Sequence, residues 1–214
     1  MSAVRGRVTR TRAAIAVGVV GLLVAMVLDT TLLNAAEQLA VEEPTFSAAT
    51  YVAERFAETA TMITDKAVDL PVLAEALDSD AASAGAEYGV SSGTGDYVYA
   101  VSATGTVTGI DDRFIEIAID AMPAGADVRI PLTTALNGAP IRDAPGTAEF
   151  GDFANQTDYQ AVANEYKLKV QADVIGGIDL ATLSGRSLSV IGAWMAGGPD
   201  NTFIIQPISL EVSG

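Results

Sequence analysis

The sequence contains no cysteine and no histidine among its 214 residues. The missing thiols exclude disulfides, thiolate nucleophiles and lipidation through an N-terminal cysteine. The missing imidazoles exclude Ser-His-Asp triads, and the two absences together exclude Cys/His zinc sites. A chain without cysteine is compatible with an oxidising compartment, although the absence does not identify one. These exclusions favour a protein that binds other molecules over one that transforms them.

Basic residues are scarce and unevenly distributed, with 12 lysines and arginines against 27 aspartates and glutamates. Four arginines lie within residues 1–12, and every acidic residue lies at Asp29 or beyond. The acidic remainder of the chain would repel a phosphate backbone, so we predict no nucleic-acid partner. Residues 91–96 (SSGTGD) are glycine-rich but lack the G-K-[ST] of a phosphate-binding loop. We therefore predict a flexible turn there and no cofactor.

The N-terminal part contains one long uncharged apolar run, from Ala13 to Leu28. At about 1.5 Å per helical residue this run falls slightly short of a hydrocarbon core of about 30 Å, and residues 30–33 can extend it. The preceding arginines place the N-terminus in the cytoplasm by the positive-inside rule. We predict that residues 1–33 form a basic stub and a transmembrane anchor, which makes the chain a single-pass cell-membrane protein with an extracytoplasmic domain. The alternatives are a cleaved signal peptide, for which no A-x-A site is visible, and a buried helix of a soluble protein.

Residues 34–90 are predicted to form a connector followed by short helices. A first helix is predicted over residues 47–66 with Ser47 as its N-cap, and Asp69 is the predicted N-cap of a second one. Residues 81–88 are predicted to form a third, weaker helix. The sequence leaves open whether these helices pack on the following domain or form a stalk.

From Tyr97 onward the apolar residues recur at every second position, the period of a strand with one buried face. Gly105 is predicted to mark a bulge in the first strand, and Pro131 to lie at the end or the edge of the third. The predicted inward-facing residues of five strands are Tyr97, Tyr99, Val101 and Ala103, then Ile115, Ile117 and Ile119, then Val128, Ile130 and Leu132, then Leu188, Val190, Gly192 and Trp194, and finally Ile204, Ile208, Leu210 and Val212.

Between the third and fourth of these strands, residues 155–177 have the period of an amphipathic helix. Thr157 and Gln160 have the spacing of a T-x-x-Q capping box, and Gly176 with Gly177 is predicted to end the helix. The predicted buried face consists of Tyr159, Val162, Ala163, Tyr166, Val170 and Val174.

Three strands, a helix and two strands follow one another in the order of an OB-fold, a five-stranded Greek-key barrel. We therefore predict a mainly β domain with helices, in which residues 91–214 form an OB-fold-like barrel. Other α+β domains share this order, so the order alone does not decide between them.

Three stretches carry a more specific pattern. The first reads R-D … F-x-x-F-x-N-Q-x-x-Y … V-A-N, and its residues are Arg142-Asp143, Phe150, Phe153, Asn155-Gln156, Tyr159 and Val162-Ala163-Asn164. The others are residues 66–70 (KAVDL) and 205–212 (IQPISLEV). Together with the G-x-V that begins at Gly105, they resemble a family of predicted periplasmic lipoproteins, and the likeness runs from about Phe46 to Ser213.

The resemblance implies an OB-fold barrel, in agreement with the strand order. The family has no assigned reaction, and its genes tend to lie beside components of sugar ABC transporters, which implies an accessory role in sugar uptake. Lipoprotein members carry a lipobox cysteine, which this sequence lacks. The predicted N-terminal helix would therefore have to provide the anchor.

Arg142 and Asp143 lie in a predicted loop between Pro140 and Pro145. They are candidates to bind a carboxylate, sugar hydroxyls or a partner, and the alternative is a local turn with a surface ion pair.

Three polar residues at the start of the predicted helix, Asn155, Gln156 and Asp158, are candidates to hydrogen-bond a polyol. The alternative is that they satisfy the free amides of the first helical turn. The resemblance adds Asn164, from the V-A-N of the same helix. With Arg142 and Asp143, these residues are the predicted ligand- or partner-binding set.

Trp194 is the sole tryptophan, a candidate platform for a sugar ring, with packing in the core or rim as the alternative. The acidic stretches at residues 78–80 and 111–112 do not fit a twelve-residue Ca²⁺ loop, and turn roles explain them. No two carboxylates are placed together in an apolar setting for acid–base chemistry. We therefore predict no metal site and no enzymatic activity.

The preferred hypothesis is a non-enzymatic, membrane-anchored extracytoplasmic domain. It would assist a sugar ABC transporter by contacting the permease or a binding protein. The alternative is an extracytoplasmic module that itself binds a small sugar or an oligosaccharide.

Overall fold

The computed structural model describes residues 46–92, 96–135 and 138–213. Residues Phe46–Gly214 form one compact unit. The predicted anchor lies outside the described residues. Within the described part of the chain, no helix is both long enough and apolar enough to cross a membrane.

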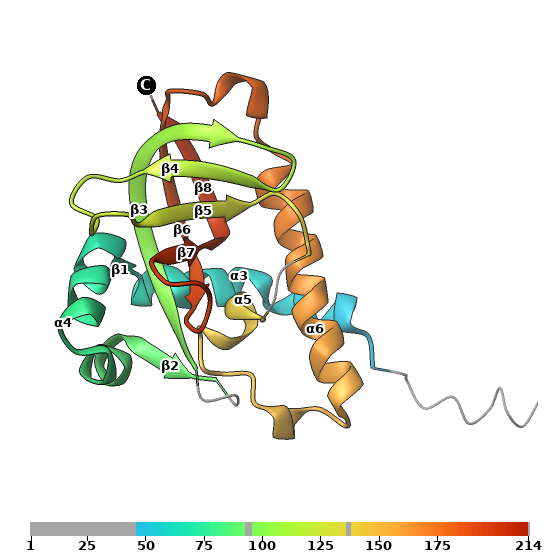
Figure 1. Cartoon of the computed structure of the whole chain (residues 1–214). Helices are drawn as coiled ribbons and strands as arrows, with labels where there is room; N and C mark the ends of the chain where they lie inside the picture. The colour runs from blue at the N-terminus through green and yellow to red at the C-terminus, as the bar shows by residue number, and fades with distance from the viewer. Residues whose placement is uncertain (1–45, 93–95, 136–137, 214) are drawn as a thin grey trace, which may run out of the picture. The chain divides into compact units, whose positions relative to one another are not determined.

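One curved sheet dominates this unit (Figure 1). Its main strands follow the order β7-β5-β4-β3-β6-β8. Their bounds are β3 Tyr97–Ile110, β4 Phe114–Ala118, β5 Asp127–Pro131, β6 Ser187–Met195, β7 Thr202–Ile204 and β8 Gln206–Ser213.

The sheet curls round because both ends of its strand order belong to one stretch of chain. β7 pairs with β5 in parallel, whereas β8 pairs with β6 in antiparallel orientation. Only Ile205 separates β7 from β8, and its N–H donates to the carbonyl oxygen of Arg129 in β5 at 2.9 Å. The predicted mainly β fold with one long helix between the third and fourth barrel strands is confirmed.

β3 is the strand on which the rest of the sheet is assembled. It pairs with β4 and β6, and also with two short strands, β1 (Val68–Asp69) and β2 (Gly89–Ser91). The predicted inward residues Tyr99 and Val101 are buried, but Val98 is buried too. Both faces of β3 are largely covered, and the helices of residues 48–66 and 70–88 contact this strand.

The sheet contains two irregularities that correct the strand predictions. The bulge predicted at Gly105 is wrong: the register of β3 shifts between Val107 and Gly109. Gly105 instead lies so close to β4 that a Cβ atom would come within 2.5 Å of the Ala118 carbonyl oxygen.

A second register shift lies at residues 207–209 of β8, opposite Ile191 and Gly192. The extra residue there reverses which side chains face inward. Ile205 is therefore fully buried in the last strands, whereas the predicted Ile204 does not belong to the core.

Two helices that precede the main strands in the chain pack against the sheet. α3 spans Ala48–Lys66, and the predicted cap Ser47 accepts a hydrogen bond from the N–H of Thr50 at 3.2 Å. α4 spans Leu70–Tyr88. Because Val52, Ile63, Leu70 and Leu73 belong to the core of the sheet, the packed arrangement replaces the stalk alternative.

The predicted break between the second and third helices appears as a kink in α4 at Asp80. This residue has φ −156° and ψ 94°, outside the helical region. Its carboxylate accepts hydrogen bonds from the N–H groups of Ala82 and Ser83, both at 3.1 Å. Asp80 therefore caps the second half of α4 in the way that an N-cap begins a separate helix.

The helix predicted over residues 155–177 consists of α6, Gln156–Lys169, and a π-helical turn η2, Val170–Ile175. The predicted face is confirmed, because Val162, Ala163, Tyr166 and Val170 are buried. The remaining helical segments are short: α5 Pro140–Asp143, η1 Phe150–Asp152 and η3 Leu180–Thr182.

Gly192 provides a test of this barrel, because a Cβ atom there would collide with the carbonyl oxygen of Gln206 across the β6–β8 shift. We expect Gly192→Ala to lower the free energy of unfolding by about 1–3 kcal/mol, the usual cost of overpacking. Gly198→Ala is the matched control, because a Cβ atom added at Gly198 would have no heavy atom within 4 Å. Equal urea midpoints for Gly192→Ala and Gly198→Ala would contradict this β6–β8 pairing.

Candidate functional site

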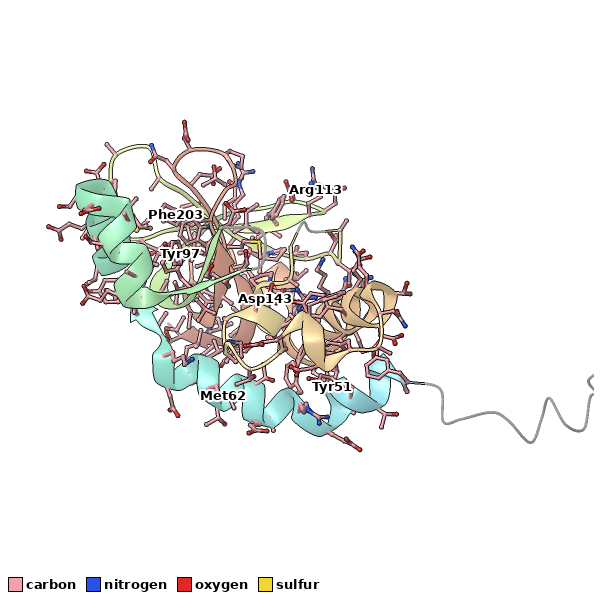
Figure 2. All side chains as sticks on the ribbon, turned by 90° about the horizontal axis from the view of Figure 1, so that it is seen from below. Tyr51, Met62, Tyr97, Arg113, Asp143 and Phe203 are labelled. Atoms are coloured by element: carbon pink, nitrogen blue, oxygen red, sulfur yellow. The ribbon has the colours of Figure 1, made fainter. Side chains whose placement is uncertain are left out.

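Residues 140–143, predicted as a loop, form the short helix α5. Pro140 lies at its first turn, where the missing N–H costs no hydrogen bond. In Figure 2, Asp143 lies on α5 in the middle of the domain, and α5 contacts α3, α6 and β6. These contacts remove α5 from solvent, so the alternative of a turn with a surface ion pair is wrong.

Arg142 and Asp143 form a buried ion pair whose side chains are 8% and 9% exposed. Nε of Arg142 donates to Oδ1 of Asp143 at 2.6 Å, and Nη2 donates to Oδ2 at 3.0 Å. This bidentate arrangement, called the fork below, makes the charge-assisted contact both directional and strong. Removing a charge from water is costly, so such a pair persists only where its geometry is good.

Tyr159 of α6 completes the cluster. Nη1 of Arg142 donates to the Tyr159 carbonyl oxygen at 2.9 Å, and the guanidinium lies 3.4 Å from the centre of the Tyr159 ring. The Tyr159 hydroxyl donates to Oδ1 of Asp143 at 3.4 Å. Burial, followed by the negative charge of Asp143, raises the pKa of the Tyr159 phenol, so the hydroxyl remains a donor at neutral pH.

The cluster lines a pocket of about 820 Å³ between α5, α6, β2 and residues 146–150. This volume lies in the range of small-molecule sites. Besides Arg142 and Asp143, its polar lining includes Ser91, Ser92, Glu149, Gln156, Gln160 and Asn164. The pocket therefore combines charged, amide and hydroxyl groups in one concave space.

Aromatic rings form part of the pocket wall. Phe150 is 55% exposed, and its ring meets the Tyr159 ring edge-on at 5.6 Å between centroids. Both side chains line the pocket. An exposed phenylalanine beside buried charges offers an apolar contact to a ligand that also needs hydrogen bonds.

Lys167 is a pocket-lining residue that the sequence patterns did not single out. It lines the pocket from α6 and is only 7% exposed. Burial, followed by the positive charge of Arg142, lowers the pKa of its ammonium group. The available signal was a polar stripe at helical spacing, formed by Gln156, Gln160, Asn164 and Lys167.

The pocket brings together four of the six predicted residues: Arg142, Asp143, Gln156 and Asn164. Asn155 and Asp158 are not in its lining. Oδ1 of Asn155 accepts from the N–H of Asp158 at 2.9 Å, and Nδ2 of Asn155 donates to the Asp158 carboxylate at 2.9 Å. Asn155 is therefore the N-cap of α6, and the capping box predicted from Thr157 is wrong.

Other candidates have structural roles in the described part of the chain. Trp194 stacks on Tyr99 at 5.3 Å and contacts Phe203 at 4.9 Å between centroids. Asp111 accepts from the N–H groups of Arg113 and Phe114 at 2.7 and 2.6 Å, and these bonds lower the pKa of its carboxyl. No group of three or more acidic side chains suited to a metal occurs among the described residues.

A second hollow of about 530 Å³ lies on the sheet, mainly over β3 and β6. Its lining includes Thr104 and Ser189, whose hydroxyls are 2.9 Å apart in a hydrogen bond. It is lined by neither an aromatic nor a basic side chain. The pocket beside α6 is therefore the better-equipped candidate.

The buried ion pair predicts a large penalty for removing one charge. Asp143→Asn keeps the shape of the side chain but leaves Arg142 without its counter-charge, so we expect a loss of roughly 3–5 kcal/mol in the free energy of unfolding. Lys169→Met is the control, because the side chains of the Lys169–Asp173 pair are 30% and 53% exposed and its loss should cost less than about 1 kcal/mol. Similar urea denaturation curves for the two variants would show that the Arg142–Asp143 pair is solvated.

The cap assignment makes a separate prediction. Asn155→Ala should cost about 1 kcal/mol, because it removes the acceptor for the Asp158 N–H. Thr157→Ala should change stability by less than about 0.5 kcal/mol, as a surface substitution does. The opposite order of the two thermal denaturation midpoints would restore Thr157 as the cap.

Comparison with known proteins bears on the fold and the family. Among curated proteins, none matches this chain. A crystal structure of an OB-fold protein from Thermotoga maritima is similar, with a TM-score of 0.65 and 19% sequence identity, and the likeness covers 78% of this chain and 99% of that chain. This likeness supports the OB-fold and says nothing of activity. A family model described as "Predicted periplasmic lipoprotein (DUF2291)" matches residues 15–211, and the chain therefore belongs to this family, as its motifs predicted.

Proposed function

We propose that this chain is a non-enzymatic extracytoplasmic domain whose pocket beside α6 binds a small sugar. The family description supports a domain outside the cytoplasm. The observation that carries the proposal is the buried Arg142–Asp143 pair in the wall of an 820 Å³ pocket.

The pair suits a ligand that is rich in hydroxyl groups. A guanidinium has five N–H donors, and the bonds to Asp143 and Tyr159 engage three of them. The remaining donors and the carboxylate oxygens can share a hydroxyl that both donates and accepts. Because Asp143 and Tyr159 hold the guanidinium in place, a ligand would lose little free energy in ordering the site.

The other lining groups fit the same ligand class. Gln156, Gln160 and Asn164 present amides, each of which can donate and accept. Phe150 and Tyr159 supply aromatic surface for the C–H face of a sugar ring. Convergent polar groups beside apolar surface are typical of a small-molecule site.

A second candidate function is an accessory role in a sugar ABC transporter. A family described as periplasmic supports this role, because such a domain would meet the sugar before the permease does. In this proposal the domain contacts the permease or the sugar-binding protein. Co-purification of the full chain with permease subunits from membranes tests it, and recovery of the chain without any transporter component would contradict it.

The exposed phenylalanine gives a test of sugar binding with little effect on folding. We expect a calorimetric screen of the full chain with ribose, xylose, glucose, galactose and galacturonate to find at least one ligand. Phe150→Ala should weaken its binding at least about tenfold, or 1.4 kcal/mol. Leu168→Ala is the matched control, because Leu168 is 52% exposed on α6 but does not line the pocket.

Two results would contradict the proposal. One is a screen in which no sugar binds the folded chain. The other is equal loss of binding in Phe150→Ala and Leu168→Ala, which would place the ligand away from the pocket.

A further inference from the structure

Five aromatic side chains of the domain form one continuous series of ring contacts. Phe150 meets Tyr159 at 5.6 Å between ring centroids, and Tyr159 meets Phe153 at 5.3 Å. Phe153 then meets Phe46 at 5.8 Å and Tyr51 at 5.5 Å. Phe150 and Tyr159 line the pocket beside α6, whereas the other three rings lie outside its lining. The aromatic series therefore leads from the pocket to the beginning of α3, where Tyr51 lies (Figure 2).

The two ends of this aromatic series are exposed. Tyr51 and Phe153 pack against the core, whereas Phe46 is 42% exposed and Phe150 is 55% exposed. These two are the exposed phenylalanines among the described residues. A single exposed apolar side chain is ordinary, but exposed rings joined into one surface are a candidate for contact with another molecule. The aromatic series thus offers a second area of contact next to the pocket.

The geometry of the contacts leaves ring surface available at both ends. The planes of Phe150 and Tyr159 meet at 89°, and those of Phe46 and Phe153 meet at 88°. Such edge-on pairs are favourable, and they cover less of a ring face than stacking does. Phe46 and Phe150 can therefore each present ring surface to a ligand.

We propose that the ligand is an uncharged oligosaccharide, whose terminal sugar lies in the pocket and whose next units extend along the aromatic series to Phe46. This inference rests on the proposed function and names its ligand class. From Phe150 to Phe46, successive ring centroids are 5.3 to 5.8 Å apart. One sugar unit with its linking oxygen spans roughly 5 Å, given covalent bonds of about 1.5 Å. The spacing of the rings therefore suits consecutive sugar units.

A donor group lies at the outer end of the aromatic series. The guanidinium of Arg55 lies 4.1 Å from the centroid of the Tyr51 ring, and its side chain is 46% exposed. A guanidinium has five N–H donors, and the ion pair with Glu54 at 3.6 Å engages only part of them. Sugar hydroxyls beyond the pocket would therefore find both an aromatic platform and a hydrogen-bond donor.

A lipid bilayer is the competing partner for exposed phenylalanines. Anionic headgroups would be repelled by a chain whose formal net charge is −15, whereas an uncharged oligosaccharide would not. A sugar unit linked to one that is already bound also makes its contact within an existing complex, so it adds affinity without a second cost of association. Charge and linkage therefore both favour the oligosaccharide.

The test is calorimetry on the full chain with xylose, glucose and galactose, and with the β-linked disaccharide and trisaccharide of each. In at least one of these series, we expect the trisaccharide to bind at least about ten times more tightly than its monosaccharide, or 1.4 kcal/mol. Phe46→Ala should weaken binding of this trisaccharide about fivefold and leave the monosaccharide within about twofold, because the terminal sugar does not reach Phe46. Phe46→Tyr should keep the affinity, because it keeps the ring. Val72→Ala is the matched control, because Val72 is 50% exposed on α4 and lies outside the pocket lining and the aromatic series.

The outcomes separate the two proposals. If no trisaccharide binds more tightly than its monosaccharide, the inference on ligand class is overturned, but the proposed function stands if any sugar of the screen binds. If Phe46→Ala and Val72→Ala bind the trisaccharide equally well, Phe46 is not a platform for the ligand, and the inference also fails. If no sugar of either set binds, the proposed function itself fails. The comparison in the unaltered chain requires no variant to fold.

Discussion

The fork between Arg142 and Asp143 is the interaction on which the candidate site depends. Two adjacent residues of a four-residue helix could not hold this geometry alone, because so short a helix has little stability of its own. Tyr159 fixes the guanidinium from α6 through its carbonyl oxygen and its ring. The pair therefore joins α5 to α6, and the pocket exists where these two elements meet β2 and residues 146–150.

The barrel supplies the frame that holds these helices. β3 extends through the domain and pairs with β1, β2, β4 and β6, so its position is determined by neighbours on both sides (Figure 1). The core under it includes residues of α3, α4 and α6. Because one core includes both the sheet and the helices, α5 and α6 hold their part of the site on packed elements, which keep a binding geometry better than loops do.

The sequence predicted the elements in which a periodic pattern of apolar residues extends over many positions. Alternation in β6 and the helical spacing of Val162, Tyr166 and Val170 both follow from one buried face. The short strands β1 and β2 were missed because two or three residues are too few for a period. The burial of Arg142 was missed because two prolines around a charged pair resemble a surface turn. Lys167 was missed because only tertiary packing decides which lysine of a helix is covered.

The proposed ligand site lies beside the buried Arg142–Asp143 pair and not on the open sheet. Chemical-shift mapping of the isotope-labelled full chain with the sugar that binds best tests it most directly. Binding there predicts shifts in α5, α6, β2 and residues 146–150, where the pocket lies. Shifts confined to the hollow around Thr104 and Ser189 would contradict it.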